Sequence, residues 1–208
     1  MGSSVSIIIG ITGGIACGKS EAGRVLSAEG FKVLDCDVLA HELMSSGRPV
    51  YSRVVAQFGK DILADDGEID RRKLGTRVFK NPDELTALNR MVHPAVLTAA
   101  KEWVAACRAA DEDAAVLVPL LFEVNWTDGW DATVCIIAPE NQAVEQLQHQ
   151  RGFNEDEARR RMAAQMPLDE KAAKSDFVIW NDSTLESFRN KMIDLAECVR
   201  SRKKREQP

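Results

Sequence analysis

A glycine-rich segment near the N-terminus constrains this chain more than any other feature. Residues 13–20 read Gly-Gly-Ile-Ala-Cys-Gly-Lys-Ser, which fits the pattern of a glycine, four residues and then Gly-Lys-Ser. Gly13 and Gly18 permit backbone angles and close approaches that a side chain would forbid. The N–H groups of such a loop point inward around a row of phosphates, and the dipole of the following helix adds to the attraction. The segment therefore predicts a phosphate-binding loop.

The segments on either side of this loop have the order that it requires. Residues 5–11 form an apolar, β-branched run typical of a buried parallel strand. Residues 21–29 carry apolar side chains at helical spacing and end before a glycine. Within the loop, Lys19 would bridge β- and γ-phosphate oxygens, and Ser20 would bind Mg²⁺. A glycine-rich turn with an incidental lysine is the alternative, and the flanking strand and helix argue against it.

Four further strands are predicted, separated by helical patterns. They cover residues 31–34, 114–118, 132–137 and 176–180. Strands that alternate with helices indicate an α/β fold with a parallel five-stranded sheet and helices on both faces. With the phosphate-binding loop (P-loop), this is the P-loop NTPase fold. Ligands of such sheets bind beyond the carboxyl ends of the strands.

The 208 residues fit one kinase domain with two helical insertions. Its core is expected at residues 1–37, 111–139 and 175–208, with insertions at about 38–110 and about 140–174. The first insertion would bind the phosphate acceptor, and the second, rich in arginine and lysine, would close over ATP as a lid. Pro94 is expected to break or restart a helix at His93. Together these parts indicate a small-molecule kinase.

Composition excludes several other classes of protein. A net charge of −5 argues against a surface that binds nucleic acid, and no apolar run reaches the length of a membrane span. No secretory signal is visible, and the five cysteines form no C-x-x-C pair, which fits a reducing cytoplasm. The three histidines lack metal-ligand spacing. The basic segment 200–208 is expected to be a frayed, solvated helix end.

Several polar residues are candidates for the chemistry, each with a structural alternative. Asp37 follows the second strand and would orient the attacking hydroxyl and accept its proton, or it caps the helix at 38–43. Arg161 and Gln165 are four residues apart and are expected to share a helix face, where arginine would stabilise the transferred phosphoryl group. The alternative for the run 159–161 is a solvated helix face.

Three further candidates stay open from spacing alone. Glu123 follows the third strand, where a carboxylate would influence Mg²⁺ or its waters. The usual form of such a site, an acid directly after four apolar residues on the strand itself, is less clear here. The basic cluster 71–73 meets acceptor phosphates or faces solvent. His93 is either a buried, hydrogen-bonded histidine or a contact to the acceptor.

The motifs occur together, in order, along nearly the whole chain: Gly10–Ser20, Asp35–Ala40, Ile69–Leu74, Val92–Pro94, Val118–Glu123, Arg161–Gln165 and Ser175–Asn181. In this combination the chain resembles the dephospho-CoA kinase family. The resemblance implies transfer of the ATP γ-phosphoryl group to the ribose 3′-hydroxyl of dephospho-CoA, with Mg²⁺ as cofactor. It implies neither a nucleic-acid nor a membrane partner, and it leaves the oligomeric state open, with a monomer compatible.

The resemblance also assigns residues. Asp37 matches the catalytic aspartate, and Lys19, Arg151 and Arg161 are the other expected catalytic residues. ATP would contact Gly13, Gly14, Ile15, Ala16, Cys17, Gly18, Lys19, Ser20 and, near the adenine, Asn181. Dephospho-CoA would contact Asp37, Arg71, His93, Pro94, Leu120, Glu123 and Gln165.

The chain departs from the family pattern at three places. Glu21 stands where the family usually has a small or hydroxyl residue, and weaker nucleotide affinity is the largest effect expected. Residues 145–150 lack a frequent lid arginine, which makes Arg151 a candidate beside Arg161 for stabilising the transition state. Trp180 replaces a frequent aspartate. The alternative functions are those of a nucleoside monophosphate or shikimate kinase, of a GTPase, and of a relative that binds its ligands without catalysis.

Overall fold

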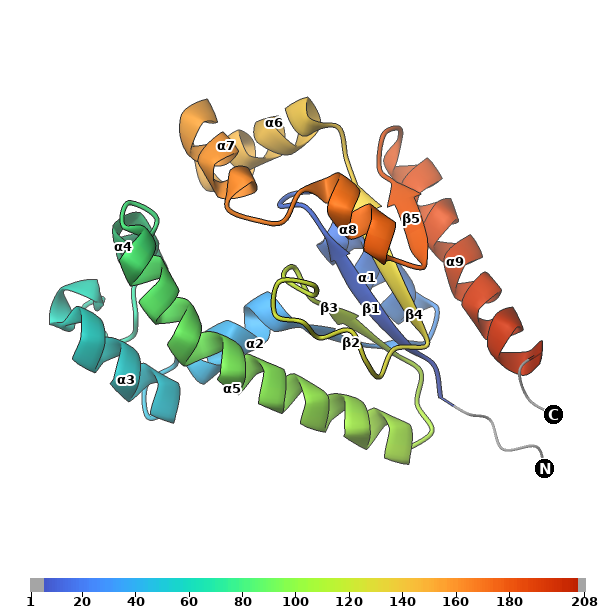
Figure 1. The fold of residues 1–208 in the computed structure, drawn as a ribbon, viewed down its shortest axis with the longest axis horizontal. Helices are drawn as coiled ribbons and strands as arrows, with labels where there is room; N and C mark the ends of the chain where they lie inside the picture. Colours follow the sequence, from blue (N-terminus) through green and yellow to red (C-terminus); the bar gives the residue numbers. More distant parts are fainter. Residues whose placement is uncertain (1–5, 206–208) are drawn as a thin grey trace. The chain divides into compact units, whose positions relative to one another are not determined.

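The computed structural model describes residues 6–205, apart from the side chains of Gln150, Arg151 and Lys204 (Figure 1). The chain forms two compact units. The first unit comprises Met1–Asp35 and Trp103–Pro208, and the second comprises Cys36–Glu102. In the described residues, no helix combines the length and the apolar character that crossing a membrane requires.

The first unit is built on the predicted five-stranded parallel sheet. Its strands lie in the order β2-β3-β1-β4-β5, so β1 is central and pairs with β3 on one side and β4 on the other. The strands are β1 (Ile8–Gly13), β2 (Lys32–Asp35), β3 (Ala114–Leu117), β4 (Ala132–Ile137) and β5 (Phe177–Trp180). Every residue of β1, β3 and β4 is buried, which explains their continuous apolar runs.

The central strand extends further than its apolar pattern indicates. Pairing of β1 with β4 continues to Gly13, opposite Ile136, so the ladder carries the chain into the first glycine of the loop. The predicted strand ends at Ile11, the last residue of the apolar run. Thr12 is nevertheless fully buried, with its hydroxyl donating to the carbonyl of Pro119 at 3.3 Å.

Helices cover both faces of this sheet, as Figure 1 shows with α8 in front of the strands and α1 behind them. Leu26, Phe188 and Met192 from α1 and α9 pack with the apolar side chains of β1 and β4 in one core. The helices of this unit are α1 (Lys19–Ala28), α6 (Glu140–Arg151), α7 (Glu155–Ala163), α8 (Leu168–Lys174) and α9 (Leu185–Arg205). The last turns of α5 (Pro82–Ala109), from Trp103 on, also belong to it.

The basic C-terminal segment is held more firmly than expected. Helix α9 extends to Arg205, and three of its basic residues contact other segments of the first unit. Arg200 donates to Asp113 at 3.2 Å and lies over the ring of Phe31, Arg202 lies over a ring of β5, and Lys203 pairs with Asp131. The prediction of a frayed end is therefore wrong for residues 200–203, because these cations have partners far away in the sequence. Residues 206–208 lie outside the described part.

The second unit is helical and has its own core. It contains α2 (Cys36–Leu43), α3 (Pro49–Phe58), the short 3₁₀ helix η1 (Lys60–Ile62), α4 (Arg71–Val78) and the first part of α5. The buried side chains that these elements share are those of Val50, Val54, Phe58, Ile62, Leu74, Val78 and Val92.

Helix α5 runs through Pro94 without a break, so the prediction of a helix boundary at His93 is wrong. A proline inside a helix removes one backbone hydrogen bond and costs about 3 kcal/mol in an isolated helix. Here the apolar side chains on either side of it, Val92, Ala95 and Val96, all pack into the core of the second unit. Burial on both sides of the proline keeps the two halves of the helix in line.

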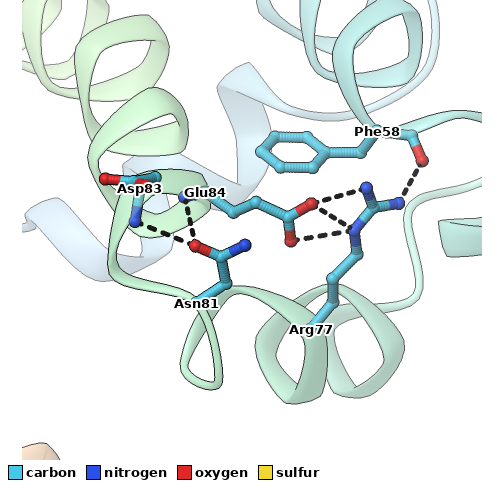
Figure 2. A network of polar contacts seen from close by, with 5 residues as sticks. All are labelled: Phe58, Arg77, Asn81, Asp83 and Glu84. Atoms are coloured by element: carbon cyan, nitrogen blue, oxygen red, sulfur yellow. Dashed lines mark hydrogen bonds and ion pairs between the residues drawn. The ribbon is translucent and has the colours of Figure 1, made fainter.

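A polar network joins α4 to the start of α5 (Figure 2). The Arg77 guanidinium donates to both carboxylate oxygens of Glu84, at 2.7–3.0 Å, and to the carbonyl of Phe58 at 2.6 Å. The Asn81 side chain accepts the N–H groups of Asp83 and Glu84 at the first turn of α5. The hydrogen bond from Arg77 lowers the pKa of the Glu84 carboxyl below its ordinary value. This network stabilises the turn between the two helices.

The lowered pKa of Glu84 makes its contribution to stability depend on pH. The contribution is complete above the pKa of the unfolded carboxyl, about 4.3, and is lost as the pH falls through the lower folded value. Glu84→Gln should therefore lower the urea midpoint at pH 7, and the difference from wild type should shrink as the pH falls below about 4. Glu42→Gln, at an exposed position of α2, is the control. A difference that stays constant with pH would contradict this account.

Candidate active site

The loop between β1 and α1 has a backbone that requires its glycines. Gly13 has φ +137°, and a Cβ there would lie 2.2 Å from the carbonyl oxygen of Ile136. Gly18 has φ +103°, and a Cβ there would lie 2.7 Å from Nδ2 of Asn181. Ala16 also has a left-handed backbone, with φ +59°. A side chain at position 13 would collide with the backbone of Ile136, whereas at position 18 it would meet the Asn181 side chain and strain the left-handed backbone.

The first turn of α1 presents backbone N–H groups at the end of this loop. The first hydrogen bond of the helix runs from the N–H of Ala22 to the carbonyl of Gly18, at 3.0 Å. The N–H groups of Ser20 and Glu21 precede it, and such groups at a helix start have no partner within the helix. Together with the helix dipole they attract an anion. The Ser20 residue is exposed at the same turn.

Lys19 lies across the loop itself. Its Nζ donates to the carbonyls of Gly13, at 3.1 Å, and Gly14, at 2.6 Å. These contacts hold a positive charge beside the amide groups that follow β1. The flexible lysine stem can transfer the ammonium from these carbonyls to a stronger acceptor such as a phosphate oxygen.

A residue directly after β5 braces the far side of the loop. Asn181, directly after β5, donates from Nδ2 to the carbonyl of Cys17 at 3.2 Å, and its own N–H donates to the carbonyl of Ile137. The Cys17 side chain is fully buried. On β4, burial raises the pKa of the Cys135 thiol to about 11, which keeps that thiol neutral. The loop is thus fixed by contacts to the ends of β4 and β5.

A buried lysine joins α8 to the segment after β3. Lys171 has no exposed surface, and its Nζ donates to the carbonyl of Pro119 at 2.6 Å and lies 2.8 Å from Oε1 of Glu123. The same Glu123 oxygen accepts the N–H of Met166 at 3.0 Å. Glu123, a predicted substrate contact, is therefore engaged with the chain that leads into α8. Leu120, another predicted contact, is half-buried in the same segment.

This role of Lys171 has no local sequence signal. The residue stands in a polar seven-residue helix, and its basic character alone predicts a lid cation that faces solvent. Its partner Glu123 lies far earlier in the chain, so the pair becomes visible only in three dimensions.

The predicted lid residues lie at the end of α6, within α7 and directly after α7. Arg161 is 13% exposed; it donates to Glu157 at 2.9 Å and lies over the ring of Phe153 at 4.0 Å. Helix α7 ends at Ala163, and Gln165 follows the helix, so the prediction that it shares a helix face with Arg161 is wrong. Arg151 ends α6, and its side chain lies outside the described part.

The remaining predicted residues belong to the second unit. Helix α2 begins at Cys36, directly after β2, so Asp37 lies inside its first turn and does not cap it from outside. Arg71 begins α4, whose cap is the Asp70 side chain. His93 and Pro94 lie within α5. Asp37 therefore follows the carboxyl end of a strand, as predicted, but its alternative role as an N-cap is wrong.

Comparison with known proteins adds to this geometry. The sequence profile of the dephospho-CoA kinase family matches residues 7–187 of the chain. The chain belongs to the dephospho-CoA kinase family. It is similar to the dephospho-CoA kinase of Carboxydothermus hydrogenoformans, with 41% identity over 191 residues, 91% of this chain and 93% of that protein.

Solved structures agree with the predicted fold. A Thermus thermophilus crystal structure is 33% identical, with a TM-score of 0.71 over 92% of this chain and 97% of that one. The dephospho-CoA kinase of Campylobacter jejuni, at 24% identity, shares the fold, with a TM-score of 0.67 over 93% of this chain and 97% of that one. The family match confirms the predicted family and kinase class, and these structures confirm the predicted fold.

The Glu123–Lys171 pair supports a first prediction on the site. Lys171→Met should lower the free energy of unfolding by about 2 kcal/mol, because it leaves the partly exposed Glu123 carboxylate and the Pro119 carbonyl without their cation. Combining it with Glu123→Gln should recover part of that loss. Lys174→Met, at an exposed lysine of the same helix, is the matched control in urea unfolding. Equal stability of the two lysine variants would contradict this account of the pair.

Proposed function

We propose that the protein transfers the γ-phosphoryl group of ATP to the ribose 3′-hydroxyl of dephospho-CoA, which gives CoA and ADP. Membership of the dephospho-CoA kinase family supports this reaction. The structural observation that carries it is the loop at residues 13–20, whose glycines permit a phosphate-sized anion to approach the N-terminus of α1.

The loop would hold the triphosphate through its backbone and Lys19. The N–H groups of residues 13–20 would bind the β-phosphate, and the Lys19 ammonium would leave the carbonyls of Gly13 and Gly14 for β- and γ-phosphate oxygens. Asn181 supports the loop at Cys17 and would lie beside the adenine. Positive charge aimed at the γ-phosphoryl group stabilises its transfer more than its binding.

Ser20 is the residue that would hold Mg²⁺. Its hydroxyl is a hard oxygen ligand at an exposed position of the first turn of α1, and phosphate oxygens and water would supply the other ligands. When bound, the ion neutralises charge between the β- and γ-phosphates. Within the described residues, no group of three or more His, Cys, Asp and Glu side chains forms a metal site of its own.

Asp37 would act on the acceptor. Its carboxylate would orient the 3′-hydroxyl and take its proton as the oxygen bonds to the γ-phosphorus and the bond to ADP breaks. Arg151 and Arg161 would offset the negative charge on the phosphoryl group in the transition state of its transfer. The other expected contacts to dephospho-CoA are Arg71, His93, Pro94, Leu120, Glu123 and Gln165, with the second unit as the acceptor-binding part and residues 140–174 as the lid.

We further propose that the protein works in the cytoplasm on these two small molecules, with neither a nucleic-acid nor a membrane partner. The acidic net charge and the cysteines, free at all five positions, support this setting. A monomer suffices for the reaction, because one chain supplies the loop, Ser20 and Asp37.

An acceptor comparison tests the proposal. Release of ADP is followed in a coupled assay with ATP, Mg²⁺ and one of four acceptors: dephospho-CoA, AMP, CMP or shikimate. We expect kcat/KM for dephospho-CoA to exceed each of the others by a factor of about 100 or more, because binding of the correct acceptor positions its hydroxyl. Equal or better turnover of a nucleoside monophosphate or shikimate would reject dephospho-CoA as the substrate.

The same assay tests Asp37. Asp37→Asn should lower kcat by about 10²–10⁴-fold, because the amide accepts no proton, while ATP binding stays close to wild type. Asp65→Asn, at an exposed position of the second unit, is the matched control and should leave kcat unchanged. Normal turnover by the Asp37 variant would remove this residue from the mechanism.

A further inference from the structure

Glu21 presents an electrostatic conflict at the proposed nucleotide site. It follows the proposed Mg²⁺ ligand directly and lies in the first turn of the helix whose N-terminus would hold a triphosphate. A carboxylate suits the helix dipole at this position, but it repels a bound polyanion. A carboxylate here is compatible with tight nucleotide binding only if its charge is offset or directed away from the phosphates.

The structure contains such a compensating contact. Oε1 of Glu21 accepts a hydrogen bond from Nε of Arg189 at 2.6 Å, and Oε2 pairs with Arg24. The Glu21 side chain is 12% exposed and that of Arg189 is 51% exposed, so the carboxylate is largely shielded from water while the guanidinium is half in solvent.

Arg189 is anchored beside the loop by its own helix. It belongs to α9, and the preceding residue, Phe188, is buried. The Cζ atom of Phe188 lies 3.5 Å from the position that a Cβ on Gly18 would take. Helices α1 and α9 pack against each other. Arg24, by contrast, lies one turn along α1 from Glu21 and is 73% exposed, so it restrains the carboxylate less.

We propose that Arg189 is a positioning residue for nucleotide binding. It holds the Glu21 carboxylate on the side of α1 that faces α9 and offsets its charge, so that the loop accepts a triphosphate despite an acid in the first turn. This inference rests on the proposed function, because it assumes that ATP binds at the loop. Arg189 acts through Glu21 and need not contact the nucleotide.

Two other roles for Arg189 make different predictions. If Arg189 attracted the phosphates by its own charge, its removal would weaken ATP binding whether or not Glu21 carried a charge. If Arg189 only held α9 against α1, its removal would lower stability and leave ATP affinity unchanged. A double-mutant cycle with Glu21 separates these roles from the proposed one.

The cycle uses wild type, Arg189→Met, Glu21→Gln and the double variant, with the dissociation constant of ATP in excess Mg²⁺ measured by calorimetry at low salt. We expect Arg189→Met to weaken ATP binding about tenfold, or about 1.4 kcal/mol. Glu21→Gln should bind at least as tightly as wild type, and the double variant should lie within about twofold of Glu21→Gln. Arg189→Lys, which keeps the charge, should restore most of the affinity.

Arg202→Met is the control, because it removes an exposed cation from the same helix, one that lies over the ring of Phe177. Its ATP affinity should match wild type. An unchanged affinity in Arg189→Met, or an equal loss in the charged and the neutral Glu21 backgrounds, would overturn the proposal. Failure of wild type to bind ATP, or binding that survives Lys19→Ala undiminished, would instead overturn the assignment of the loop.

Discussion

The hydrogen-bonded ladder of β1 with β3 and β4 is the constraint on which the rest of the first unit depends. Because β1 is central and its pairing with β4 continues to Gly13, the chain leaves the sheet at a fixed point. The turn that follows lies close against the Ile136 carbonyl, where only glycine fits. The start of α1 and its N–H groups are therefore positioned by the core of the sheet, not by the flexible loop alone.

Contacts from distant parts of the chain complete this arrangement. Asn181 binds the loop carbonyl of Cys17, Lys171 joins α8 to the segment after β3, and Arg189 engages the first turn of α1. Each of these residues lies in the C-terminal quarter of the chain and contacts a segment from its first two thirds. The phosphate-binding loop thus depends on sequence that follows it by more than 150 residues.

The parts that sequence predicts well are those with a local physical cause. The Gly13–Ser20 loop and all five strands follow from residue types within a few positions of each other, and the structure confirms the fold. Lys171, whose charge alone predicts a solvent-facing lid residue, is buried because its partner Glu123 comes from another strand end. The run through Pro94 shows the same limit, since burial on both sides of the proline outweighs its local preference.

Sequence motifs point to Asp37 and Arg161, but they do not give the contacts of these side chains. The contacts of Arg161 with Glu157 and Phe153 depend on how α7 folds against the chain before it. Glu21 departs visibly from the family pattern, but no sequence pattern points to its partner Arg189. Trp180, at the end of β5, is half exposed, and nothing in the structure explains this departure from the family pattern.

The most direct test of the account is a crystal structure of the protein with Mg²⁺ and a non-hydrolysable ATP analogue. The account predicts that the β-phosphate lies within the backbone of residues 13–20. It also predicts that Lys19 Nζ moves from the Gly13 and Gly14 carbonyls to oxygens of the β- and γ-phosphates. A nucleotide bound elsewhere, with Lys19 still on those two carbonyls, would contradict it.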